Sequence, residues 1–458
     1  MTAHPSSTSI AQALPMPQRN SLHVVVIGGG IGGLALAQGL KKNGVSVAVY
    51  ERDSTPTDRV QGYRVHINPT GSLALHECLP PDLFDAFTRT CGKPSQGIRF
   101  LTEQGRALLT MNALNGSPGL RGEGVAQHRS VSRITLRQVL LSGLGDVVHF
   151  GKTFAHYEAS ATGRIVSYFE DGSMAEGDIL IAADGGGSRV RRQFLPQAQR
   201  IDTGIVGIAG KVFLDEGSRR RVPAEFLNSL TLVSGRGGYA FFVALQDIDG
   251  VAASSLDGIG GNDDLAQAGS HFDNAKSYLM WAFGAKRQKF GLADNVEDTP
   301  PEVLRAAVLR AMQERKWDER FATLVRMADP GTINALPIRT LKPVDPWPTQ
   351  HVTLLGDAIH SMTPYRGIGA NVALKDAMRL CRALTAASRG ERPVLEAIND
   401  YETAMIDYGF RAVRTSLHAM NQAIVDSCLK SMLSRTALRI FNRVPPLKKM
   451  MFERMGEE

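Results

Sequence analysis

The chain has 458 residues, of which 43% are hydrophobic and 21% are charged, and its formal net charge is +7. This length suits two or three domains of roughly 150 residues, and the composition is that of a globular protein. No stretch approaches the roughly 18 consecutive apolar residues that span a bilayer, which argues against an integral membrane protein. The four cysteines form no CxxC pair, which argues against a metal site or a disulfide framework and suits a reducing, cytoplasmic compartment.

The first segment with regular spacing has the pattern of a βαβ unit. His23–Ile27 is a short apolar run that ends in glycines, Leu34–Leu40 has helical spacing, and Val45–Tyr50 is a second β-rich run. Farther along, Ile165–Phe169 and Ile179–Ala183 flank a turn signal, which predicts a hairpin or meander.

The middle of the chain predicts a different kind of sheet. Tyr239–Leu245 and Tyr278–Phe283 are short runs with the period-two character of antiparallel strands, whereas His351–Leu355 is again a buried-strand run followed by a helical pattern. The chain is therefore expected to leave an α/β domain, form a β-rich one, and return. The expected boundaries are a disordered tail at 1–20, a nucleotide-binding domain at 21–92, 125–200 and 333–395, a mostly antiparallel sheet domain at 93–124 and 201–332, and helices at 396–458.

Both ends of the chain have biased composition. Residues 1–20 lack an apolar core of signal-peptide length, so we expect a disordered tail, with an atypical targeting segment as the alternative. Basic residues are frequent in the last segment; we interpret them as a solvated helical face, with weak contact to an anionic membrane surface as the alternative. Aromatics are not interleaved with them, which argues against nucleic-acid binding. These basic residues are Lys430, Arg435, Arg439, Arg443, Lys448, Lys449 and Arg454.

The glycines after the first strand satisfy the GxGxxG pattern of a dinucleotide-binding turn. Gly28 permits the tight turn, Gly30 lets the backbone approach a pyrophosphate, and Gly33 allows the helix to pack closely on the strand. The phosphates would lie at the positive end of the helix. Glu51 closes the second strand, where a carboxylate accepts hydrogen bonds from a ribose diol.

Two further motifs follow buried strands. One begins at Asp184-Gly185 and runs to Arg191. The other begins at Gly356-Asp357, passes Pro364, and continues through Gly367 and Gly369-Ala370-Asn371 to Asp376-Ala377. Both put a carboxylate at the C-terminal end of a strand, where open α/β sheets bind ligands.

In this order and spacing, the three motifs resemble those of the single-component FAD monooxygenases, the para-hydroxybenzoate hydroxylase-like family, over about residues 21–395. Natural-product tailoring members look most similar. The resemblance implies an α/β fold with a Rossmann-like FAD-binding domain, an inserted, mostly antiparallel sheet domain that binds the substrate, and a C-terminal helical segment. It also implies FAD as the cofactor and NADPH, or NADH, as a transient co-substrate.

The resemblance also implies roles for individual residues. Asp357 would bind the ribityl chain or its neighbouring phosphate, Asp184 would lie in a motif shared by flavin and NAD(P)H, and Arg133 would open a helix beneath FAD. Backbone N–H groups of Gly369, Ala370 and Asn371 would face the flavin pyrimidine. The expected cofactor-binding residues are Gly28, Gly30, Gly33, Glu51, Gly62, Arg64, Arg133, Asp184, Gly185, Gly356, Asp357, Gly367, Gly369, Ala370 and Asn371.

The expected reaction is hydroxylation or epoxidation of an aromatic or polycyclic small molecule with NAD(P)H and O2, through a flavin C4a-hydroperoxide. We expect the substrate pocket to include Tyr239, Phe241 and Trp281, with Tyr239, Lys211 and Pro364 nearest the chemistry. The alternative for the three aromatics is that they belong to the core of the sheet. Lys211 stands where many relatives have an arginine, so the bidentate fork is lost and a point charge remains.

Other functions are compatible with parts of this pattern. A flavoprotein that acts as a redox or binding module without oxygenase turnover would share the fold. A flavin-dependent halogenase is disfavoured because the tryptophans are isolated and no WxWxIP segment is present. The substrate, the choice of nicotinamide and the oligomeric state, monomer or homodimer, stay open.

Overall fold

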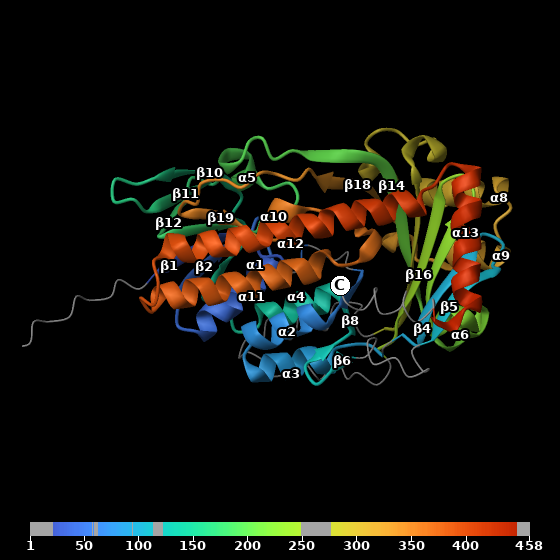
Figure 1. Cartoon of the computed structure of the whole chain (residues 1–458), viewed down its shortest axis with the longest axis horizontal. Helices are drawn as coiled ribbons and strands as arrows, with labels where there is room; N and C mark the ends of the chain where they lie inside the picture. Colours follow the sequence, from blue (N-terminus) through green and yellow to red (C-terminus); the bar gives the residue numbers. More distant parts are fainter. Residues whose placement is uncertain are drawn as a thin grey trace, which may run out of the picture.

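A computed structural model describes residues 22–56, 58, 63–93, 95–112, 122–248 and 276–446. The expected tail at 1–20, Gly62 and the last basic residues lie outside these ranges. Within them, the chain forms an α/β region and a second β-rich region, and a long helix runs alongside both (Figure 1). The expected combination of a Rossmann-like domain and a second sheet is confirmed.

The α/β region is built on a parallel sheet of five strands in the order β19-β13-β1-β2-β9. Residues Val24–Ile27 are at most 3% exposed, as expected for a strand covered on both faces. The strands are β1 (His23–Ile27), β2 (Ser46–Tyr50), β9 (Val148–His149), β13 (Ile179–Ala182) and β19 (Val352–Leu354).

The strand order changes direction at β1, because the chain first adds β2 on one side and later adds β13 on the other. Open α/β sheets bind ligands at such a switch point, beyond the carboxyl ends of the strands. Helix α1 packs directly on β1 and β2. The helices of this region are α1 (Ile31–Lys42), α2 (Pro69–Cys78), α3 (Pro81–Arg89), α4 (Arg133–Leu141), α5 (Arg189–Phe194), α10 (Asp357–His360) and α11 (Gly369–Ser388).

Smaller sheets flank this core. The turn signal at Asp171-Gly172 connects β11 to β12, so the predicted hairpin is present, but β13 belongs to the parallel sheet instead. The short strands are β10 (Phe154–Ala159), β11 (Ile165–Phe169) and β12 (Met174–Gly177), the pair β3 (Arg64–Ile67) and β8 (Arg129–Ser132), and the pair β6 (Gly122–Glu123) and β7 (Ala126–Gln127).

The second region is a seven-stranded sheet in the order β18-β14-β17-β16-β15-β4-β5, antiparallel except between β15 and β4. β18 pairs with β14, so the return to the parallel sheet comes at β19 and later than the expected residue 333. The strands are β4 (Gly97–Thr102), β5 (Ala107–Asn112), β14 (Arg200–Phe213), β15 (Leu230–Gly235), β16 (Tyr239–Gln246), β17 (Tyr278–Lys286) and β18 (Asn334–Leu341).

Helices cover one face of this sheet and enclose a second hydrophobic core. That core joins the sheet to α8 (Pro301–Glu314) and α9 (Glu319–Met327). Short helical segments complete the region: α6 (Glu216–Arg221), η2 (Ala224–Leu227), η5 (Arg287–Phe290), η6 (Val296–Asp298) and η7 (Pro330–Thr332).

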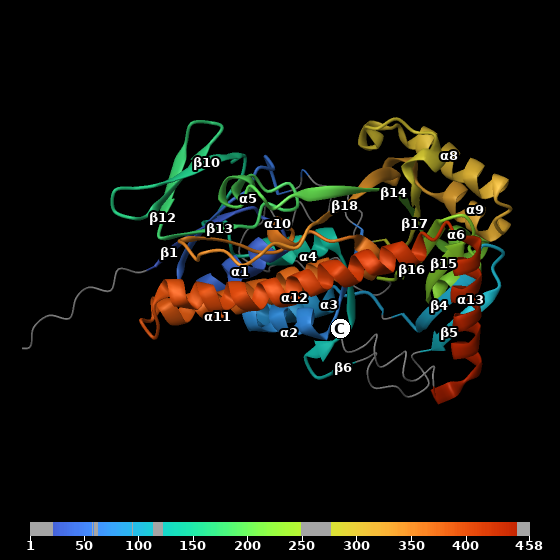
Figure 2. The same ribbon diagram turned by 45° about the horizontal axis from the view of Figure 1, so that its top comes forward.

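The C-terminal helices link the two regions. The 30-residue α12 (Val394–Ala423) packs on α11 and reaches β18 and η8 (Pro364–Arg366), so it lies along both sheets (Figure 2). α13 (Cys428–Arg443) then packs against β5 and ends before Pro445-Pro446. Among the described residues, no helix has the length and hydropathy required to cross a membrane.

Candidate functional site

The glycine turn between β1 and α1 has the stereochemistry that its pattern predicts. Gly28 has a φ of +113°, and a Cβ there would lie 2.4 Å from the carbonyl oxygen of Ala183. A Cβ on Gly33 would lie 2.2 Å from the carbonyl oxygen of Gly28, so helix and turn touch through backbone alone. A Cβ on Gly30 would meet no atom within 4 Å. The space beside Gly30 is therefore open to a ligand.

Glu51 is buried and holds the same turn. Its Oε2 accepts a hydrogen bond from the Gly29 amide at 2.6 Å, and its Oε1 accepts one from the Asp53 amide at 3.0 Å. Each carboxylate oxygen has a second lone pair, so the side chain can still accept from a ribose diol. That role stays a prediction.

Two arginines at the start of α4 differ in what they contact. Arg133 is exposed, and its backbone amide donates to the Tyr63 carbonyl at 3.2 Å. Arg137, one turn later, donates from Nε to the Gly29 carbonyl at 3.2 Å and forms an ion pair with Asp53 at 3.4 Å. Arg137 thus supports the glycine turn directly, which its spacing four residues after Arg133 could have indicated.

The second motif is folded around Asp184. Its Oδ2 accepts a hydrogen bond from the Arg189 amide at 2.7 Å, whereas its Oδ1 is buried and has no partner among the described residues. Burial raises the pKa of Asp184, although the Ser188 hydroxyl and nearby amides oppose this. Gly185 follows with a φ of +76°, and a Cβ there would meet no atom within 4 Å.

Arg191 joins the second motif to the third. It is 3% exposed and donates hydrogen bonds to the carbonyl oxygens of Ala358, at 2.7 Å, and Gly186, at 3.0 Å. A buried guanidinium that bonds two loops fixes their separation. The second motif, predicted from Asp184, therefore also contains Arg191, which positions the loop of the third motif.

The third motif rests on a buried polar cluster below Gly356 and Asp357. The Gly356 amide donates to Asp376 Oδ2 at 2.7 Å, and His360 Nε2 lies 2.6 Å from the same oxygen. The Tyr408 hydroxyl donates to Asp376 Oδ1 at 2.6 Å. Asp357 itself is exposed at the start of α10. The loop is thus held from beneath while its expected cofactor carboxylate stays accessible.

The start of α11 is connected to β3 through Asn371. Asn371 Oδ1 accepts from the Asn68 amide at 2.9 Å, and its Nδ2 donates to the His66 carbonyl at 2.8 Å. Gly369 and Ala370 precede it in the first turn, and Gly367 has a φ of +64° with no atom within 4 Å of a Cβ. The side chain of Asn371 is structural, so only its backbone is available to a cofactor.

The three motifs meet at one edge of the parallel sheet. They follow β1, β13 and β19, which are neighbours, and they leave their parallel strands at the same end. Open space beside Gly30, Gly185 and Gly367 and the unsatisfied buried Oδ1 of Asp184 are features that a bound dinucleotide would complete. The residues present therefore fit FAD.

The expected aromatic pocket requires a correction. Tyr239, Phe241 and Trp281 are 2%, 1% and 0% exposed and belong to the core between the sheet and α8 and α9. Tyr239 stacks on Phe283 with ring centroids 5.4 Å apart. These side chains therefore point away from the nucleotide-binding region, and the core alternative for them holds.

The prediction of this pocket was wrong because side chains along a strand alternate with a period of two residues. Successive side chains alternate between faces, so a choice that is wrong by one residue selects the wrong face throughout. The opposite face of the central strands carries Lys211, Phe242, Met280, Ala209 and Ala282, all partly exposed. This face, which we call the inner face, is the one that Tyr365 of the third motif's loop approaches. Lys211 is thus the only expected sheet-domain residue that lies on it.

The inner face meets the α/β region through a polar cluster. The Ser130 hydroxyl donates to Gln246 Oε1 at 2.5 Å and accepts from Arg64 Nε. Lys211 Nζ lies 4.6 Å from the centroid of the Tyr278 ring. Among the described residues, the ionisable neighbour that raises the pKa of Arg64 is the phenol of Tyr278 and not a carboxylate, and the buried Tyr278 hydroxyl has no hydrogen-bond partner.

Burial shifts the two titratable groups of this cluster in opposite directions. It lowers the pKa of Arg64 and raises the pKa of Tyr278, in both cases because a charged form loses hydration. Tyr278 is therefore neutral at physiological pH and keeps a proton to donate. Among the residues that the structure describes, the Tyr278 hydroxyl is thus a buried donor without a hydrogen-bond acceptor.

Pro364 stands between the two regions. It is exposed at the start of η8, and the next residue, Tyr365, reaches the sheet, where a Cβ on Gly284 would lie 2.5 Å from its hydroxyl oxygen. The glycine at 284 thus lets the loop of the third motif approach the inner face.

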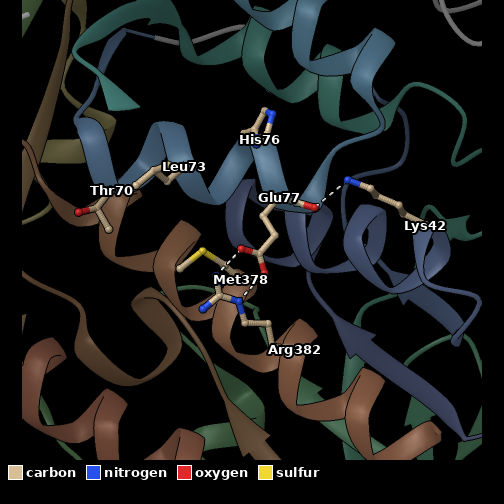
Figure 3. A pocket seen from close by; sticks show the side chains of 7 residues that line it. All are labelled: Lys42, Thr70, Leu73, His76, Glu77, Met378 and Arg382. Carbon is tan, nitrogen blue, oxygen red and sulfur yellow. Dashed lines mark hydrogen bonds and ion pairs between the residues drawn. The ribbon is translucent and has the colours of Figure 1, made fainter. Parts of the chain in front are cut away.

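A separate hollow lies on the molecular surface, and none of the expected site residues lines it. It has a volume of about 420 Å³, and α2 contributes Thr70, Leu73, His76 and Glu77 while α11 contributes Met378 and Arg382 (Figure 3). Glu77 and Arg382 pair across it, and Lys42 donates to the Glu77 carbonyl. Because the charged side chains of Glu77 and Arg382 pair with each other and Lys42 is hydrogen-bonded, we assign this hollow no role in the candidate site.

Two protein families match parts of the chain. Residues 26–87 match a family described as an NAD(P)-binding Rossmann-like domain, and residues 287–416 match one described as an FAD binding domain. The first range contains the glycine turn, and the second contains the third motif.

Whole-chain similarities point in the same direction. A solved structure from Photorhabdus luminescens subsp. laumondii TTO1, provisionally described as an FAD-containing monooxygenase, is 33% identical with a TM-score of 0.75, covering 89% of this chain and all of that one. The dual O-methyltransferase/FAD-dependent monooxygenase elcB of Phaeosphaeria nodorum is 30% identical over 85% of this chain. The FAD-dependent monooxygenase thnD of Trichoderma harzianum is 27% identical over 93% of this chain and 99% of its own length. The chain spans less than half the length of elcB and of two other dual-function relatives.

Proposed function

The chain belongs to the family of FAD-dependent monooxygenases, and from this premise we propose that it inserts one oxygen atom of O2 into an aromatic or polycyclic small molecule. NAD(P)H would supply the two electrons, and the second oxygen atom would leave as water. The observation that carries the proposal is the meeting of the three motifs at the switch point, opposite the partly exposed inner face.

Different residues are proposed to bind different parts of FAD. The turn at Gly28–Gly33 would receive the pyrophosphate and Glu51 the adenosine ribose. Asp357 would bind the ribityl side, and the amides at Gly369 and Ala370 the flavin ring. When bound, FAD supplies the two-electron chemistry with nicotinamide and O2. The protein's task is to bind it, orient the substrate and exclude water.

We propose the inner face as the substrate surface. Phe242 and Met280 offer apolar contact to a planar ring, and the small side chains of Ala209 and Ala282 leave room for it. Placing a reactant at a fixed distance from the reacting centre is a large part of what such a surface contributes.

The polar cluster at one end of the inner face would orient the substrate. A phenolate, enolate or carboxylate oxygen is the group that Arg64 and Lys211 would attract, and the neutral Tyr278 hydroxyl can donate a hydrogen bond to it. An ionised phenol is also the more electron-rich ring for oxygen transfer. This favours an acidic phenol or a related enolisable compound over a neutral hydrocarbon.

The test of the function is substrate-stimulated electron consumption. We would follow NADPH and NADH oxidation by the FAD-loaded protein under air, with phenolic, indolic and quinolone compounds. A substrate should stimulate oxidation by about tenfold or more and yield a product one oxygen atom heavier. Stimulation without oxygen incorporation would instead support the redox-module alternative.

A paired variant tests the cofactor assignment. Asp357→Ala should give protein that is folded but retains little FAD, because the proposed ribityl contact is lost. The control is Glu216→Ala, whose side chain is 95% exposed and far along the chain from the three motifs. A fully flavinylated Asp357→Ala protein would contradict the assignment.

A further inference from the structure

The outer side of α13 carries a row of exposed apolar side chains. Leu429, Leu433, Ile440 and the C-cap residue Val444 are 62%, 59%, 49% and 36% exposed, and Met432 beside them is 59% exposed. Steps of four, seven and four residues place them on one side of a helix with 3.6 residues per turn. Solvated helices of globular proteins normally turn such a row toward the core.

The opposite side of α13 is already anchored, so the row is not a displaced core. Arg435 is 5% exposed and donates to Glu103 and to the Ser234 carbonyl. Leu438 and Phe441 pack on the cluster around Leu109. The helix cannot rotate the row inward without breaking a buried ion pair.

Charge on α13 is of one sign only. Residues 428–443 contain no aspartate or glutamate. Lys430 lies on one flank of the apolar row, Arg439 and Arg443 lie on the other, and all three are exposed. This is the distribution of a helix that lies in an interface, where long cationic side chains extend from an apolar face toward phosphate groups.

We propose that α13 attaches the protein to the surface of an anionic phospholipid bilayer. The apolar row would enter the boundary between headgroups and acyl chains, and the three cations would contact lipid phosphates. α13 stands at one end of the molecule in both views, which leaves its outer side accessible to a planar surface (Figures 1 and 2). With 16 residues it is too short to span a bilayer, which takes roughly 20.

Charge also argues against a second copy as the occupant. In a two-fold dimer through this row, the same surface faces itself, and Lys430, Arg439 and Arg443 would meet other cations. A partner with negative charge on a broad flat surface is complementary to the row and its flanks, and an anionic bilayer is such a partner.

The experiment is co-sedimentation of the full FAD-loaded chain with vesicles. Vesicles of phosphatidylcholine with about 30% phosphatidylserine should bind the protein, pure phosphatidylcholine should bind it much more weakly, and added salt should release it. Leu433→Glu with Ile440→Glu should reduce binding by at least about tenfold, because charges replace the inserted side chains. Lys430→Glu with Arg439→Glu should have an effect on the order of tenfold through the electrostatic attraction.

A control introduces one such carboxylate elsewhere on the surface. Val303→Glu changes an exposed apolar residue of α8, 48% exposed, and should leave binding unchanged. Unaltered sedimentation of the Leu433/Ile440 variant would overturn the proposal, as would failure of the unmodified protein to bind anionic vesicles. Light scattering tests the dimer alternative. If the unmodified protein is a dimer that does not bind vesicles, and the Leu433/Ile440 variant is a monomer, then the row contacts a second copy of the chain.

Discussion

His360 and Asp376 are both fully buried, with Nε2 and Oδ2 2.6 Å apart. Burial by itself disfavours the imidazolium, but the nearby Asp376 carboxylate outweighs it and raises the pKa of His360 above its ordinary value of 6.5. The pair lies directly below the loop of Gly356 and Asp357. Because the Gly356 amide donates to the same Asp376 oxygen, proton binding at His360 and the anchoring of this loop are coupled through one carboxylate.

This coupling predicts a pH dependence of stability. Because the folded state holds the proton more tightly than the unfolded state, the contribution is fully present below about pH 6.5 and is lost as pH rises through the raised pKa. Each unit of elevation is worth about 1.4 kcal/mol. The free energy of unfolding at saturating FAD should therefore fall as pH rises above about 6.5 and through the raised pKa of His360, and His360→Gln should flatten that slope. Parallel slopes for the two proteins would contradict the prediction.

The glycine turn allows cofactor binding to be separated from folding. Gly30→Ala adds a methyl group to open space, so the apoprotein should keep its stability to within about 1 kcal/mol while its FAD affinity falls. Gly33→Ala forces a Cβ to 2.2 Å from a backbone oxygen and should cost about 1–3 kcal/mol or more. Chemical unfolding and FAD titration of both variants measure the contrast. Equal losses of stability would show that Gly30 is also structural.

Much of this turn could be predicted because its chemistry is local. A strand, three glycines, a helix and a terminal carboxylate lie within 30 residues, and each glycine has a steric task that its neighbours determine. Less of the third motif could be predicted, because the contacts that hold its loop are not evident from the sequence. Asp376 belongs to the predicted motif, but nothing in the sequence indicates that its carboxylate holds the loop of Asp357 or that Tyr408 bonds to it.

The inner face was harder to predict because strand β16 is apolar on both sides. Tyr239 and Phe241 alternate with Ala240 and Phe242, so hydrophobicity does not reveal which set faces the helices. That choice depends on pairing with β17 and on α8 and α9, which are distant in sequence. For similar reasons Arg435 was expected in a solvated face, whereas its partner Glu103 lies in the turn between β4 and β5, distant in sequence.

The face assignment predicts opposite outcomes for two neighbouring aromatics. Tyr239→Phe should change turnover by less than about twofold, since the ring stays in the core against Phe283. Phe242→Ala should raise KM by about tenfold or more for whichever compound stimulates NADPH oxidation most, because it removes a proposed contact. Thermal unfolding checks that both variants fold. A Tyr239→Phe protein that binds FAD but turns over slowly would contradict this assignment and indicate that Tyr239 belongs to the substrate site.

Lys211 should act on binding more than on turnover. Lys211→Met removes the positive charge near Tyr278 and keeps much of the side-chain volume, so KM for an ionised phenol should rise by about tenfold with a smaller change in kcat. Lys211→Arg should restore most of the affinity. Comparison of a phenol with its methyl ether provides the control, because the ether carries no charge and should be insensitive to the substitution.

The ion pair of Glu103 and Arg435 should dominate the docking of α13. Both side chains are nearly inaccessible, at 3% and 6%, and the guanidinium also donates to the Ser234 carbonyl. Glu103→Gln leaves a buried cation without its counter-charge, which typically costs about 3–5 kcal/mol. We expect a matching loss of stability in denaturant and faster proteolysis between α12 and α13. The double variant Glu103→Leu, Arg435→Leu should recover much of this loss, because no charge stays buried.

A surface pair provides the comparison. Asp407 and Arg411 on α12 are 65% and 66% exposed, so Asp407→Asn should change the free energy of unfolding by less than about 1 kcal/mol. If Glu103→Gln were equally mild, α13 would be held mainly by the packing of Leu438 and Phe441 and by its hydrogen bonds to β5 and to Ser234. The outer apolar row would then be free to turn inward, and exposure of that row would no longer require an external partner.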